Sequence, residues 1–133
     1  MHAILVASLA GSLALIANLA AQEPAPGKQV EQSLATSDGG SIPYLLYQPK
    51  GYAKNAAKVP MMLFLHGRGE SNGPLSIVAK WGPPRMAERG DNLPYIVISP
   101  QCPASSRWTA DEQQAGVLNL LDRISEKYPV DTS

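Results

Sequence analysis

Residues 29–47 show the pattern of two short strands joined by a turn. Residues 37–40 (SDGG) form the turn signal, and residues 42–47 (IPYLLY) form the second, more apolar run. Together with alternation before the turn, they predict a β-hairpin. Pro43 and Pro49 flank the second strand and, because proline lacks an N–H, predict an edge position for it. The alternating positions of the first strand are Val30, Gln32, Leu34 and Thr36.

Two later apolar runs lack alternation. They cover residues 61–65 (MMLFL) and 95–99 (YIVIS). Short continuous runs of this kind are typical of strands that are buried on both faces in a parallel sheet. Parallel neighbours need a crossover connection, which the segment between the runs supplies. Prolines and glycines restrict its helices to residues 75–81 and 85–89.

One longer helix is predicted near the C-terminal end. Thr109 and Glu112 have the spacing of a capping box, in which a hydroxyl and a carboxylate satisfy free N–H groups at a helix start. Asp111 and Glu112 are therefore interpreted as capping residues rather than as an acid/base pair. Pro129 is expected to end the helix. The predicted apolar face consists of Val117, Leu118, Leu121, Ile124 and Tyr128.

The order of these elements predicts the fold class. A hairpin, a strand, a crossover, a strand and a helix indicate an α/β fold, in which an antiparallel hairpin leads into a mostly parallel sheet with flanking helices. The 133 residues, of which 44% are hydrophobic and 17% charged, allow one domain or less. The chain ends where the next strand of such a sheet is expected, so the fold is predicted to be incomplete.

The N-terminal segment has the composition of a targeting signal. Residues 3–17 (AILVASLAGSLALIA) are apolar and uncharged, and small residues follow them. We interpret residues 1–21 as a signal peptide and residues 22–28 as a linker to a domain over 29–133. An uncleaved membrane anchor is the alternative. Either reading predicts a secreted or periplasmic protein, with a membrane as partner only if residues 1–21 are retained.

Charge and cysteine content exclude several classes of function. Eleven basic and eleven acidic residues give a formal net charge of zero, which does not favour nucleic-acid binding. Cys102 is the only cysteine, so no internal disulfide forms. It follows an apolar run with no cation beside it, and we expect a buried thiol rather than a nucleophile. No metal-ligand cluster, P-loop or dinucleotide fingerprint is present, so no metal or cofactor is expected.

Four segments in order carry a resemblance to a known family. They are residues 44–52 (YLLYQPKGY), residues 63–70 (LFLHGRGE), residues 99–103 (SPQCP) followed by Trp108, and residues 128–131 (YPVD). They resemble α/β-hydrolases of the secreted predicted-peptidase and phospholipase/carboxylesterase branch, which includes feruloyl-esterase-like and polyhydroxyalkanoate-depolymerase-like enzymes. The resemblance covers about residues 29–133.

The resemblance implies a serine hydrolase that acts on esters or peptides through an acyl-enzyme. In this family the loop matching His66, Gly67, Arg68 and Gly69 supplies part of the oxyanion hole. The backbone N–H of Arg68 is the expected donor, and His66 is expected to be structural. The Ser, Asp and His of the triad are expected after Ser133, so this chain is predicted to be inactive alone. Trp108 is expected either at the rim of the site or in packing.

A literal G-x-S-x-G motif occurs at residues 69–73, with Ser71 at its centre. A nucleophile elbow needs a strand that runs directly into the serine and a helix that starts at once, whereas Ser71 is predicted in a polar loop. We therefore interpret Ser71 as a loop residue, with His66 as the only base that could serve it outside the signal segment.

Three hypotheses follow from the sequence. The first is a hydrolase represented by its N-terminal part, with a small-molecule ester or peptide as substrate. The second is a short secreted protein that keeps the hydrolase fold and binds a ligand without catalysis. The third is a hydrolase that uses Ser71 and His66. The sequence does not identify a substrate for any of these three hypotheses.

Overall fold

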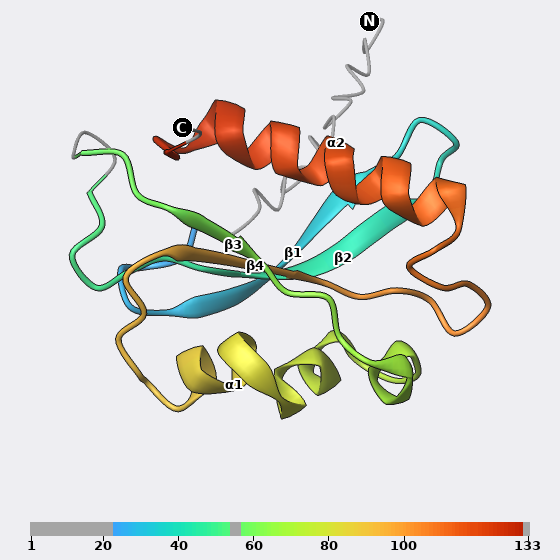
Figure 1. Ribbon diagram of the computed structural model, residues 1–133, viewed down its shortest axis with the longest axis horizontal. Helices are drawn as coiled ribbons and strands as arrows, with labels where there is room; N and C mark the ends of the chain where they lie inside the picture. Colours follow the sequence, from blue (N-terminus) through green and yellow to red (C-terminus); the bar gives the residue numbers. More distant parts are fainter. Residues whose placement is uncertain (1–22, 54–56, 132–133) are drawn as a thin grey trace, which may run out of the picture.

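The computed structural model describes residues 23–53 and 57–131, which form one sheet with helices on both faces (Figure 1). The predicted α/β fold class is confirmed. The strands are β1 (Gln29–Ala35), β2 (Ser41–Tyr47), β3 (Met61–Leu63) and β4 (Ile96–Pro100). The helices are the 3-10 helices η1 (Arg68–Ser71) and η2 (Leu75–Lys80) and the α-helices α1 (Gly82–Glu88) and α2 (Asp111–Lys127).

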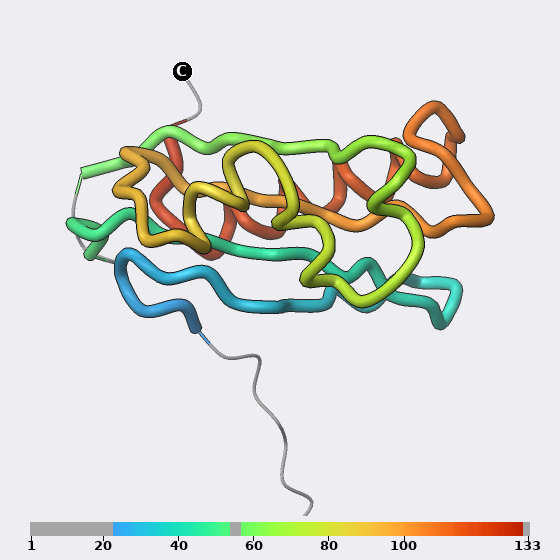
Figure 2. Tube along the Cα trace, turned by 90° about the horizontal axis from the view of Figure 1, so that it is seen from below, coloured from blue at the N-terminus to red at the C-terminus, as the bar shows by residue number. Residues whose placement is uncertain are grey.

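The strand order is β1-β2-β4-β3, which the tube in Figure 2 shows from the blue strand to the green one. β1 and β2 form the predicted antiparallel hairpin. β2 also pairs antiparallel with β4, so the prediction that β2 lies at an edge is wrong. Pro43 is tolerated because its register lies just outside the β2–β4 ladder, which begins with Tyr44 opposite Pro100. Its carbonyl still accepts a hydrogen bond from Gln101 N–H (2.9 Å).

β3 and β4 form the one parallel pair of the described sheet, with Met62 opposite Val97. All five residues of β4 are buried, as expected for a strand covered on both faces. The same expectation is wrong for β3, whose residues are only partly buried. Among the described residues β3 is the last strand on its side of the sheet, and Leu65 just beyond it is 42% exposed.

The two faces of the sheet form separate apolar clusters. On one face of the sheet lies α2 (Figure 1), and its buried residues pack against side chains from β2 and β4. On the other face, α1 covers a smaller cluster. Because successive strand residues point to opposite faces, Leu46 and Tyr47 belong to different clusters. The α2 cluster contains Tyr44, Leu46, Ile96, Ile98, Leu120, Ile124, Tyr128 and Val130. The α1 cluster contains Tyr47, Ala87, Leu93 and Val97.

The helix α2 differs from its sequence prediction at its start and on its face. Its N-cap is Ala110, and no side chain caps it, so the predicted capping box of Thr109 and Glu112 is wrong. Glu112 instead accepts a hydrogen bond from Ser106 Oγ (3.2 Å). Leu118, predicted on the apolar face, is 63% exposed, and Leu120 is fully buried in its place. The helix ends at Lys127, before Pro129, as predicted.

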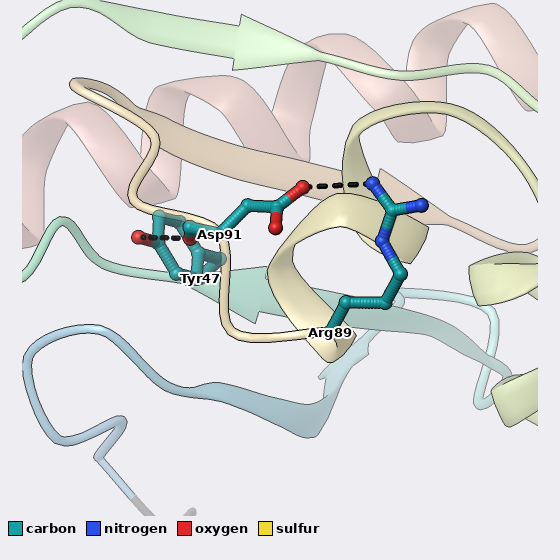
Figure 3. Close-up of polar contacts among 3 residues, drawn as sticks. All are labelled: Tyr47, Arg89 and Asp91. Atoms are coloured by element: carbon teal, nitrogen blue, oxygen red, sulfur yellow. Dashed lines mark hydrogen bonds and ion pairs between the residues drawn. The ribbon is translucent and has the colours of Figure 1, made fainter.

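The crossover between β3 and β4 contains the two predicted short helical segments. Pro83 and Pro84 lie in the first turn of α1, where a missing N–H breaks no helical hydrogen bond. The chain then returns to β4 through a loop that Tyr47 holds (Figure 3). The buried Tyr47 hydroxyl accepts a hydrogen bond from Leu93 N–H (3.2 Å) and donates one to Asp91 O (3.4 Å).

Residues 23–28 lie against the domain. Gly27 N–H donates to Gln48 O (2.8 Å), so this segment continues along the hairpin. Tyr128 Oη donates to a carboxylate oxygen of Glu23 (2.7 Å), and Lys127 forms an ion pair with the same carboxylate. The expected signal peptide, residues 1–21, lies outside the described residues. Within the described ranges, no helix has the length and apolar character needed to cross a membrane.

Candidate functional site: the loop after β3

Two loops meet where β3 and β4 end. Because these strands are parallel, their carboxyl ends lie at the same edge of the sheet, the usual place for a binding site in α/β folds. Residues 64–74 follow β3, and residues 101–110 follow β4. Every candidate site residue of the sequence analysis except Asp111 and Glu112 lies in one of these two loops.

His66 joins the two loops through its ring nitrogen Nε2 and its backbone carbonyl. Its Nε2 accepts a hydrogen bond from Cys102 N–H (2.9 Å), and its Nδ1 lies 2.6 Å from Gly67 O. Since a carbonyl oxygen only accepts, these partners place the proton on Nδ1 and leave Nε2 as acceptor. The carbonyl of His66 accepts a hydrogen bond from Trp108 Nε1 (3.0 Å), and the two rings meet edge to face at 5.2 Å.

Arg68 and Gln101 add a second set of contacts between the loops. The Arg68 guanidinium donates to Ser106 O (2.5 Å) and Ala104 O (2.8 Å). In the opposite direction, Gln101 Nε2 donates to Glu70 O (2.9 Å) and Gly73 O (3.3 Å). Side chains of both loops, Arg68 and Gln101, thus link the loop after β3 to the loop after β4. These contacts fix the direction of the backbone N–H groups in the loop after β3.

Gly67 and Arg68 form the start of η1. Gly67 is extended (φ −77°, ψ 176°) and precedes η1, so Arg68 N–H stands at the free end of a short helix. Within the described part of the chain, no hydrogen bond from this N–H is found. A side chain at position 67 would approach Glu70 Oε2, which lies 3.2 Å from the place of a Cβ.

A small pocket opens beside this loop. It has a volume of about 180 Å³ and is lined by residues 66–68, Ser71, Cys102, Arg107 and Trp108. Trp108 therefore lies at the rim of the site and also takes part in packing, the two alternatives that the sequence left open. Cys102 is 1% exposed, and burial raises the pKa of its thiol although the Arg68 charge lowers it. The sequence did not reveal Arg68 as a neighbour of this thiol.

Ser71 is the last residue of η1 and lines the same pocket as His66. It does not follow a strand directly, and the next helical segment, η2, starts only at Leu75. No hydrogen bond between Ser71 and His66 is found among the described residues, and both ring nitrogens of His66 have other partners. The geometry does not provide Ser71 with an activating base.

Sequence reasoning missed Gln101 and Arg107. Gln101 follows the buried strand directly, and a polar residue at the carboxyl end of a strand is a signal that could have pointed to it. Arg107 stands next to Trp108 in a polar loop and gave no signal of its own. Asp111 and Glu112 lie outside the pocket. In residues 23–53 and 57–131, no three His, Cys, Asp or Glu side chains gather in a way that could hold a metal ion.

Comparisons with known proteins give a structural match only. No family model matches the chain, and no curated protein matches it. The crystal structure of a thermostable esterase is similar, with a TM-score of 0.61 and 22% sequence identity. The match covers 78% of this chain and 31% of the esterase chain. We conclude that the described residues share the α/β fold of part of that esterase chain.

Proposed function

We propose that this chain carries the oxyanion-binding loop of a serine hydrolase that acts on carboxylic esters or peptides. The observation that supports this most is the free N–H of Arg68, at the carboxyl end of β3, on a loop held from both sides. A preorganised N–H of this kind stabilises the negative charge that develops on a carbonyl oxygen during acyl transfer. The similar fold of a thermostable esterase supports the same reaction class.

The roles within the described residues follow from their contacts. Arg68 N–H donates to the oxyanion. His66, Gln101 and the Arg68 guanidinium position the loop, and Trp108 borders the substrate pocket. The second oxyanion donor and the Ser, Asp and His of the triad belong, under this proposal, to sequence that follows residue 133. We propose a secreted or periplasmic location, and no cofactor.

Removal of one backbone N–H tests the proposal. Arg68 is the first residue of η1 and follows an extended glycine, a position that accepts proline without a change of conformation. In an enzyme that contains the triad, we expect Arg68→Pro to lower kcat by about 10²–10³-fold. Arg68→Ala is the matched control, because it also loses the guanidinium but keeps the N–H. Equal activity of the two variants would contradict the proposed donor.

The coding sequence gives an independent test. We expect the reading frame to continue past codon 133 and to encode a serine in a G-x-S-x-G elbow, followed by an aspartate and a histidine. A stop codon at that point would favour the second hypothesis, a secreted ligand-binding protein with this fold. The pocket beside the loop after β3 would then be its binding site.

A further inference from the structure

The pocket beside the loop after β3 is lined by two positively charged side chains and by no acidic side chain. Two of its lining residues, Arg68 and Arg107, are arginines, and none of the others is an acid. The Arg68 guanidinium donates only to neutral carbonyl oxygens, Ser106 O and Ala104 O, which do not balance its charge. Since a guanidinium has five N–H donors, these two contacts leave others for a ligand.

Arg107 is exposed at the edge of this pocket. In the described part of the chain, no hydrogen bond or ion pair of its guanidinium is found. Asp111 and Glu112 are the acids nearest to Arg107 in the sequence; neither forms an ion pair with it in the described part of the chain, and Glu112 accepts a hydrogen bond from Ser106 Oγ. Glu70, which is close to Arg68 in the sequence, is buried with one oxygen near Gly67. The formal net charge of the whole chain is zero, so the positive charge at this pocket is local.

The walls of the pocket fit a small carbon body. The rings of His66 and Trp108 stand edge to face at 5.2 Å, and both border the space. A volume of about 180 Å³ corresponds to roughly six water molecules in liquid water, which admits one ring or a short alkyl chain. Apolar walls with a convergent charged group are typical of sites for small organic anions.

We propose that this pocket binds small molecules that carry a carboxylate. The carboxylate pairs with the guanidinium of Arg107, and the carbon body lies against Trp108. For the enzyme, the inference predicts a substrate that is an ester or peptide with an acidic group. This part of the inference rests on the proposed function. The binding itself requires only the described residues.

Fluorescence of Trp108 provides the measurement. The chain has two tryptophans, and Trp81 is 59% exposed and outside this pocket, so Trp81→Phe leaves Trp108 as the single reporter. Benzoate is titrated into the Trp81→Phe protein, with benzamide as a neutral ligand of the same shape. We expect saturable binding of benzoate, and binding of benzamide weaker by about tenfold or more.

Substitutions test whether Arg107 causes the preference for benzoate over benzamide. In the same background we expect Arg107→Gln to weaken benzoate binding by about tenfold or more and to leave benzamide unaffected. Arg123→Gln is the matched control, because Arg123 is an exposed arginine of α2 paired only with Glu126. Far-UV circular dichroism confirms that each variant is folded. Arg107→Lys is expected to bind benzoate more tightly than Arg107→Gln, because it keeps the charge.

Three results would overturn the proposal: no saturable change with benzoate, equal affinity for benzoate and benzamide, or an Arg107→Gln variant that binds benzoate as well as the Arg123→Gln control. None of these results affects the test of Arg68→Pro, which concerns turnover. A loss of benzoate selectivity with an intact effect of Arg68→Pro would refute the carboxylate inference and leave the proposed function standing.

Discussion

His66 illustrates how one side chain determines the shape of the site. Its ring lies between the two loops and supplies the acceptor for Cys102 N–H. A buried N–H that loses its acceptor destabilises the folded state by about 1–3 kcal/mol. We therefore expect His66→Phe to lower the free energy of unfolding by this amount, as measured by urea denaturation.

The matched control for this prediction is His66→Gln, whose side-chain oxygen can accept the hydrogen bond from Cys102 N–H. This variant is expected to lose less stability than His66→Phe. A larger loss in His66→Gln than in His66→Phe, which keeps an aromatic ring, would mean that the ring contact with Trp108, rather than the hydrogen bond, holds the loops together.

Ser71 gives a second prediction at the residue scale. Because His66 has other partners at both ring nitrogens, Ser71 lacks a base. We expect the 133-residue chain to release p-nitrophenolate from p-nitrophenyl acetate no faster than buffer does, and Ser71→Ala to behave in the same way. Turnover above background that disappears in Ser71→Ala would restore the third hypothesis.

At the scale of elements, α2 shows what the sequence could and could not predict. The helix, its end before Pro129 and two of its buried positions, Val117 and Ile124, follow from the apolar period. The burial of Leu120 in place of Leu118 does not follow from this period, because one broad apolar face can include the residues at positions 117, 118, 120 and 121. Only the position of the sheet selects Leu120, which is fully buried, over Leu118, which is 63% exposed.

This exchange leads to a paired prediction. Leu120→Ala removes a side chain from the larger apolar cluster and is expected to lower the free energy of unfolding by about 2–5 kcal/mol. Leu118→Ala, two residues away on the same helix, is expected to change it by no more than about 0.5 kcal/mol. Urea denaturation of both variants measures the difference. Similar losses of unfolding free energy in the two variants would show that the buried face of α2 is assigned incorrectly.

At the same scale, the sequence predicted the hairpin and both short crossover helices but misjudged two strands. The prolines around β2 suggested an edge, yet Pro43 lies where the β2–β4 ladder has already ended. The continuous apolar run of β3 suggested burial on both faces, yet its residues are partly exposed. Both errors concern which strands are neighbours, and that depends on contacts between segments far apart in the sequence.

For the whole molecule, the fold class was predictable because it rests on local patterns along the chain. The loop of His66 and Gly67 follows the recognisable apolar run of β3. The bracing of that loop by Gln101, Cys102 and Trp108 was not predictable, because these residues follow a different strand and approach it only in the folded sheet. The contact of residue 23 with the end of α2 is likewise a property of the folded chain.

That contact belongs to a cluster of tyrosines that links residue 23 to the end of α2. Tyr128 donates a hydrogen bond to Glu23, and its ring meets Tyr52 edge to face at 6.2 Å. Burial, followed by the negative charge of Glu23, raises the pKa of Tyr44 and Tyr52 above the usual 10.0. Burial and the hydrogen bond to Glu23 raise the pKa of Tyr128 further. In the folded protein these hydroxyls therefore stay protonated at a pH at which they ionise in the unfolded chain.

The sign of the pH dependence follows from these shifts. A group whose pKa is higher in the folded state contributes its full stability below its unfolded pKa and loses that contribution as pH rises. Between about pH 9 and pH 11 we therefore expect the free energy of unfolding to fall, because the unfolded state releases tyrosine protons that the folded state keeps. Tyr128→Phe removes the most strongly shifted hydroxyl and should make this fall less steep, although it also removes the bond to Glu23. Urea denaturation across this range measures the slope, and equal slopes for the two proteins would contradict the role given to Tyr128.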